Sequence, residues 1–62
     1  MDNHAKQLLD QCRDAIKAGD WAKANELLEQ YEYWRATGGA APPDGDYRAL
    51  AYRMQINMGM RK

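Results

Sequence analysis

The segment GGAAPPDGD at residues 38–46 decides how this chain can fold. It contains both prolines and three of the five glycines of the 62-residue sequence, and it has no large apolar side chain. A helix or strand rarely continues through such a run, because proline lacks a backbone N–H and glycine is conformationally permissive. We therefore expect an internal flexible loop over residues 38–46, with regular structure on both sides.

Two helices are predicted before this loop. The first, over about residues 3–18, has an apolar stripe at helical spacing made of Ala5, Leu8, Leu9, Cys12, Ala15 and Ile16. The second, over about residues 21–37, has a stripe made of Trp21, Ala24, Leu27, Leu28, Tyr31 and Trp34. Gly19 suits a left-handed helix end and Asp20 suits an N-cap, so the two helices should form a tight antiparallel hairpin.

A third helix is predicted after the loop, over about residues 46–58. Asp44 or Asp46 should cap its start, and Arg61 and Lys62 near its end suit the helix dipole. The sequence has no segment with strand-like alternation. The expected fold is therefore all-α, with an antiparallel hairpin and a third helix in one small domain over residues 1–62.

The hairpin turn resembles part of a known repeat. Within residues 15–31, a Gly-Asp-aromatic turn followed by small and apolar residues resembles the turn region of a tetratricopeptide repeat. The matching residues are Gly19, Asp20, Trp21, Ala24 and Leu28. The chain departs from the pattern at Gln11 and Ala15, where larger apolar residues are usual. Such repeats bind peptides only when about three are stacked, so the resemblance implies helix geometry and not a peptide groove.

The size of the chain limits how it can be stabilised. A 62-residue domain buries only about 60% of the surface that its unfolded chain exposes. One cysteine excludes an internal disulfide, which leaves self-association as a source of stability. With no secretory leader and no apolar run of roughly 20 residues, we expect a cytoplasmic protein with no membrane partner. Compact chains with few motifs are frequent among phage and mobile-element proteins, so such an origin is one expectation.

No catalytic, cofactor or metal site is predicted. The chain has no serine, and Cys12 needs a neighbouring base to act as a nucleophile. The single histidine, His4, lies eight residues upstream of Cys12, about 12 Å away along the same helix at 1.5 Å per residue. We expect Cys12 to be a buried, inert thiol and His4 to be a frayed terminal residue. The chain should therefore be no enzyme and should have no cofactor and no small-molecule substrate.

Three glutamates, Glu26, Glu29 and Glu32, follow one another at i, i+3 spacing in the second predicted helix. We interpret them as a solvated helix face, supported by pairs such as Glu32 with Arg35. The same acids weaken a helix-turn-helix interpretation, because this helix would then face a polyanion. Glu26 and Glu29 are also placed to meet arginines of the third helix if that helix packs nearby.

The third predicted helix has two apolar faces. One is made of Tyr47, Leu50, Ala51, Met54 and Met58, and the other of Ala49, Tyr52, Ile56 and Met60. A helix that covers a hairpin needs only one such face. Either both faces pack internally, one against each neighbouring helix, or one packs internally and the other contacts a partner.

Charge is distributed unevenly along the chain. Residues 1–34 have seven acidic and four basic side chains, whereas residues 35–62 have two acidic and five basic ones. This asymmetry can steer a partner or pair two copies head to tail. We expect a regulatory or scaffolding protein-interaction module, most simply a homodimer formed through the third helix. The predicted partner-binding residues are Arg48, Tyr52, Arg53, Ile56, Met60 and Arg61.

The alternative function is that of a nucleic-acid-binding accessory protein. Basic side chains interleaved with tyrosine can bind phosphate and stack on bases. The residues that would do so are Arg48, Tyr52, Arg53, Arg61 and Lys62. The neutral total charge of the chain weakens this alternative.

Overall fold

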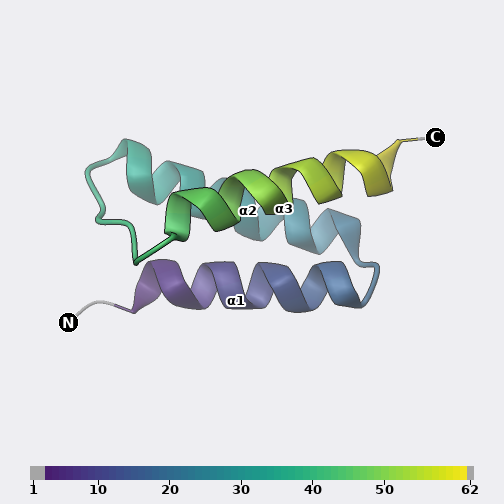
Figure 1. The fold of residues 1–62 in the computed structure, drawn as a ribbon, viewed down its shortest axis with the longest axis horizontal. Helices are drawn as coiled ribbons and strands as arrows, with labels where there is room; N and C mark the ends of the chain where they lie inside the picture. Colours follow the sequence, from purple (N-terminus) through teal and green to yellow (C-terminus); the bar gives the residue numbers. More distant parts are fainter. Residues whose placement is uncertain (1–2, 62) are drawn as a thin grey trace.

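The computed structural model describes residues 3–61 and has three helices. These are α1 (His4–Lys17), α2 (Trp21–Ala36) and α3 (Gly45–Met60), and no strand occurs within residues 3–61. The predicted all-α fold with three helices is confirmed, and each predicted helix end lies within two residues of the observed one. Figure 1 shows α2 running back along α1, and α3 then running in the direction of α1.

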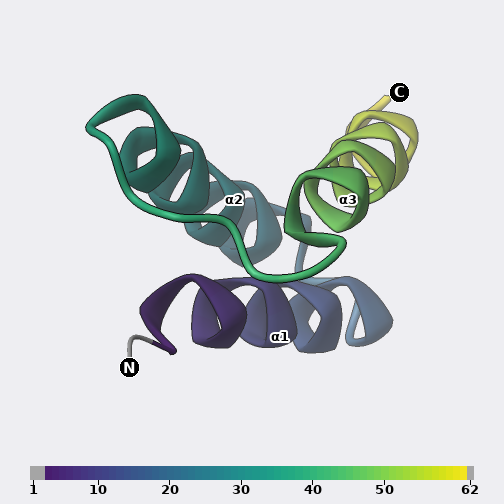
Figure 2. The same cartoon turned by 60° about the vertical axis from the view of Figure 1, so that its left-hand side comes forward.

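The core lies between the hairpin and the inner side of α3. Its α1 and α2 members come from the two predicted stripes, and Leu9, Cys12, Ala24 and Leu28 are fully buried. In Figure 2, α2 and α3 diverge like the arms of a V above α1. Because α3 lies over both other helices, it closes the open side of the hairpin.

The turn between α1 and α2 follows the prediction. Gly19 has a φ of 74°, the left-handed conformation that glycine adopts without steric cost. Its N–H donates to the carbonyl of Ile16 at 3.0 Å. The Asp20 side chain accepts a hydrogen bond from the backbone N–H of Lys23 at 3.2 Å. Both predicted roles, the helix end and the N-cap, are therefore confirmed.

The loop after α2 is shorter than predicted, because Gly45 and Asp46 already belong to α3. Asp44 occupies the N-cap position with a φ of 60°, but its side chain makes no capping hydrogen bond. Asp44 is therefore the N-cap residue, as one of the two predicted alternatives has it, but it caps through its backbone carbonyl, which accepts from the N–H of Arg48 at 2.9 Å. Asp46 does not act as the N-cap, since it lies in the first turn of the helix and its carboxylate binds α2.

The loop is held against the end of α2 by two side chains. The Trp34 indole N–H donates to the carbonyl of Ala40 at 3.1 Å, and Arg35 Nη1 donates to the carbonyl of Gly39 at 2.7 Å. A Cβ atom at Gly39 would lie only 2.2 Å from the Trp34 ring, so this position requires glycine. The indole thus packs directly on the loop backbone.

Candidate interaction surface

The inner face of α3 combines small residues with two large ones. Gly45, Ala49, Tyr52, Ile56 and Gly59 share this face at helical spacing, and Ile56 is completely buried. A Cβ atom at Gly45 would lie 2.8 Å from the Tyr31 hydroxyl, and one at Gly59 would lie 2.3 Å from the Trp21 ring. The absence of side chains at both ends lets α3 approach the hairpin closely.

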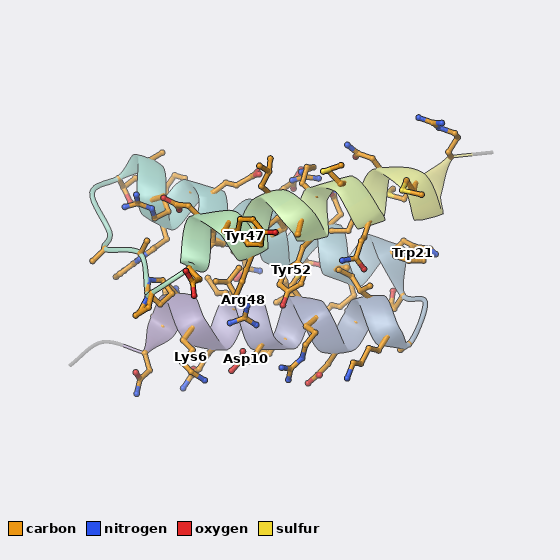
Figure 3. The ribbon with its side chains drawn as sticks, viewed as in Figure 1. Lys6, Asp10, Trp21, Tyr47, Arg48 and Tyr52 are labelled. Carbon is orange, nitrogen blue, oxygen red and sulfur yellow. The ribbon has the colours of Figure 1, made fainter. Side chains whose placement is uncertain are left out.

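An arginine on one flank of α3 binds α1. Arg48 Nη2 donates to Asp10 Oδ1 at 2.9 Å, and its guanidinium also donates to the Tyr52 hydroxyl. Figure 3 shows Arg48 and Tyr52 on the side of α3 that faces α1, with Asp10 and Lys6 below them. Hydrogen bonds from Lys6 and Arg48 lower the pKa of Asp10, so its carboxylate is favoured. This cluster anchors α3 to α1.

A second arginine, on the opposite flank, binds α2. Arg53 Nη1 donates to Asn25 Oδ1 at 2.6 Å, and Arg53 Nη2 donates to Glu32 Oε1 at 3.1 Å. The predicted pair of Glu32 with Arg35 is wrong, because Glu32 pairs with Arg53. The two arginines therefore hold α3 on the hairpin from both sides.

The start of α3 is tied to α2 through one carboxylate. Asp46 Oδ1 accepts hydrogen bonds from the Tyr31 hydroxyl at 2.9 Å and from Arg35 Nε at 3.0 Å. Arg35 Nη2 donates to the other oxygen at 3.0 Å. The hydrogen bond from Arg35 lowers the pKa of Asp46. Burial, together with the bond to Asp46, raises the pKa of Tyr31 to about 12.

The outer face of α3 is apolar and exposed. Tyr47 is 76% exposed, Leu50 64%, Met54 60% and Met58 70%. At 100° per residue Tyr47, Met54 and Met58 lie opposite Ile56, and Leu50 lies on the flank next to them. Ala51 lies among them and is half-buried. We call Tyr47, Leu50, Ala51, Met54 and Met58 the outer face of α3, and it is the candidate interaction surface.

The structure reverses the predicted use of the two apolar faces. Tyr52 and Ile56 were assigned to a partner, but Ile56 is sealed in the core and Tyr52 packs against it. The prediction that Ile56 contacts a partner is therefore wrong in this arrangement. The alternative in which both faces pack internally is also wrong, because the outer face is exposed. Of the six predicted partner-binding residues, Arg48 and Arg53 form salt bridges within the molecule. Met60 and Arg61 are exposed and form no salt bridge within residues 3–61.

The charge asymmetry of the sequence is used partly within the molecule, in two salt bridges that join its acidic and basic halves. Arg48 and Arg53 come from the basic half, and their partners Asp10 and Glu32 come from the acidic half. These contacts differ from the predicted ones with Glu26 and Glu29. The interaction between the halves therefore holds α3 in place, and less charge remains for steering another molecule.

Cys12 and His4 lie in different surroundings. Cys12 is buried, as predicted, and its Sγ–H donates to the carbonyl of Ala24 at 3.4 Å. Burial raises the pKa of its thiol.

His4 is the first residue of α1 and its ring meets the Trp34 ring edge to face, with centroids 5.0 Å apart. Within residues 3–61, no three His, Cys, Asp or Glu side chains are grouped closely enough to bind a metal ion.

An open groove runs along the exposed side of α2 toward the start of α1. Its lining includes His4, Glu29, Tyr33 and Trp34. In the described part of the chain, every buried side-chain nitrogen or oxygen has a hydrogen-bond partner. This groove is lined by polar as well as aromatic side chains, whereas the outer face of α3 is a continuous apolar surface, and we take that face as the candidate interaction site.

Acidification should weaken the contacts of α3. Asp10 and Asp46 have lowered pKa values relative to the ordinary 3.8, so they stabilise the folded state above about pH 3.8. This contribution is lost as the pH falls below that value and both carboxylates become protonated. We expect the urea midpoint to fall between pH 4 and pH 2, and to fall less in a D10N/D46N variant. Asp14→Asn, at an exposed position on α1, is the control; equal slopes in all three proteins would contradict the prediction.

None of the helices within residues 3–61 combines the length and the apolar character that crossing a membrane requires. Protein-family models, curated proteins and solved structures gave no match to this chain.

Proposed function

We propose that this chain is a non-enzymatic protein-interaction module, regulatory or scaffolding in role, that self-associates through the outer face of α3. The observation that carries the proposal is the position of that face. Four large apolar side chains lie exposed along one line, on the side away from the face that already packs on the hairpin. A helix with a second apolar face has more apolar surface than its own domain covers.

The residue types on this face suit a protein contact. Methionine side chains are flexible and polarisable, so they adapt to a facing surface, and tyrosine is enriched at interfaces. Exposed Gln55 and Asn57 lie beside the apolar line and provide a polar rim. Burying one large apolar side chain stabilises a complex by about 1.5–3 kcal/mol, against an association cost of about 4–15 kcal/mol. Two copies of this face together supply enough for a weak to moderate dimer.

The setting proposed for this module is the cytoplasm. Its only cysteine, Cys12, is a free and buried thiol, which suits a reducing compartment.

The alternative, nucleic-acid binding, has less support. Arg48 and Arg53 already pair with Asp10 and Glu32, so binding phosphate would require these contacts to break. The neutral net charge also offers little long-range attraction to a polyanion. A salt titration of binding to DNA and RNA tests this alternative directly, since micromolar affinity that falls steeply with ionic strength would favour it.

The test of self-association is sedimentation equilibrium over a wide concentration range. Met54→Glu places a charge at the centre of the outer face, and we expect it to weaken the dimer by about 100-fold, because both copies lose an apolar contact. Ala22→Glu adds the same charge at an exposed position on α2, outside the outer face of α3, and should change the affinity little. A wild-type chain that stays monomeric at millimolar concentration, or equal effects of the two substitutions, would refute the proposal.

A further inference from the structure

We propose that the second copy lies with its α3 antiparallel to the first, in one defined register. In this register Tyr47 faces Met58 of the second copy, Ala51 faces Met54, and Asp44 faces Arg61. A two-fold axis then passes between the two helices near their middle. This inference rests on the proposed function, because it specifies how the outer face is used.

The charges at the two ends of α3 favour this orientation. Asp44 precedes the first residue of α3 and Arg61 follows the last. Within residues 3–61 neither takes part in a salt bridge, unlike Asp46, Arg48 and Arg53. Antiparallel packing places each acid beside the base of the other copy, and it also opposes the two helix dipoles. Parallel packing would bring Asp44 beside Asp44 and Arg61 beside Arg61.

Side-chain size favours the same register. Tyr47, Ala51, Met54 and Met58 follow one another at i, i+4, i+7 and i+11, the spacing at which two helices contact along a seam. Opposite the small Ala51, the antiparallel register places the long Met54, which fills the space that alanine leaves. Tyr47 meets the Met58 sulfur, a favourable contact between thioether and aromatic ring. Parallel packing would instead set alanine against alanine.

Three requirements are therefore met by a single alignment. The acid and base at the helix ends, the aromatic and thioether pair, and the small and large pair all match at the same register. The flanking arginines do not obstruct it, since Arg48 and Arg53 are directed toward α1 and α2. Shifting the alignment by one helical turn would separate Asp44 from Arg61 and Tyr47 from Met58.

Disulfide trapping tests the orientation. Tyr47→Cys and Met58→Cys variants are oxidised separately and as an equimolar mixture. In the proposed register Tyr47 and its own copy are about 16 Å apart along the helix axis, too far for a disulfide, whereas Tyr47 and Met58 face each other. The mixture should therefore form the mixed disulfide, and each variant alone should stay largely uncrosslinked. The native Cys12 is buried, and Ala22→Cys on the exposed side of α2 controls for random collisions.

A second measurement does not depend on cysteines in the interface. Asp44→Asn and Arg61→Gln each remove one end charge. In the antiparallel dimer each should weaken association a few-fold, with the difference vanishing at high salt. A parallel dimer would instead be tightened by either change, because a like-charge contact is lost.

The possible outcomes separate the two proposals. Self-crosslinking by each single variant, or tighter association after loss of an end charge, would overturn the antiparallel register while self-association stands. If sedimentation shows the wild-type chain to be monomeric at millimolar concentration, self-association itself fails and the register fails with it. Preferential mixed disulfides together with weakened association in both charge variants would support the register.

Discussion

Replacing Ile56 by aspartate is expected to detach α3 or to unfold the chain. Ile56 is completely buried on the inner face of α3, where a carboxylate would have no partner. Losing the apolar contact and burying a polar group together cost about 4 kcal/mol or more. Small domains have a total stability near the low end of about 5–15 kcal/mol. Circular dichroism and urea unfolding should therefore show a largely unfolded or loosened protein at 25 °C.

Met54→Asp is the matched control for this prediction. It introduces the same side chain on the same helix, two residues away in sequence but on the opposite face. Because Met54 is exposed, its replacement should leave the secondary structure of the single subunit intact. If Ile56→Asp left the unfolding curve unchanged, or if both variants lost stability equally, the placement of the inner face would be wrong.

The second large effect is expected at Tyr31. Its side chain projects from α2 into the core and is almost completely buried. Its hydroxyl donates a hydrogen bond to Asp46 at the start of α3. Tyr31→Ala removes both the packing and the hydrogen bond, and truncation of a buried aromatic side chain costs about 3–5 kcal/mol. The midpoint of urea unfolding should fall sharply, and a large share of the molecules should be unfolded at 37 °C.

Tyr31→Phe separates the two contributions. It keeps the buried ring and removes only the hydroxyl, so its cost should be a fraction of that of the alanine substitution. The phenylalanine variant should also lose part of its dependence on Asp46, so that D46N destabilises it less than it destabilises the wild type. Additive effects of the two substitutions would show that the 2.9 Å contact contributes little to stability.

The sequence predicts the helices of this protein well, because local signals determine them. Helical periodicity marks the stripes of the first two helices, and Gly19 and Asp20 define the turn through backbone conformation and capping. The loop is visible in its prolines and glycines. Its end was misplaced because Gly45 was interpreted as a loop residue, whereas its missing side chain serves the contact with Tyr31.

The candidate surface was harder to predict, because two faces of α3 are almost equally apolar. Periodicity shows that both exist but does not say which one packs on the hairpin. A signal was present in the small residues: Gly45, Ala49 and Gly59 lie on the face with Ile56, and small side chains permit close helix packing. The arginine contacts were missed for another reason. Arg48 meets Asp10 from a distant part of the chain, and such pairs depend on tertiary structure.

The packing of Trp21 on Gly59 and of Trp34 on the loop gives the molecule two natural fluorescent probes. The Trp21 indole lies over the last turn of α3, and the Trp34 indole lies on the loop before α3 begins. Trp21 therefore senses the end of α3, and Trp34 senses the loop that leads to its start. With one tryptophan replaced by phenylalanine at a time, emission from the other would reveal whether the end of α3 or the loop before it separates first during denaturation, and no external label would be required.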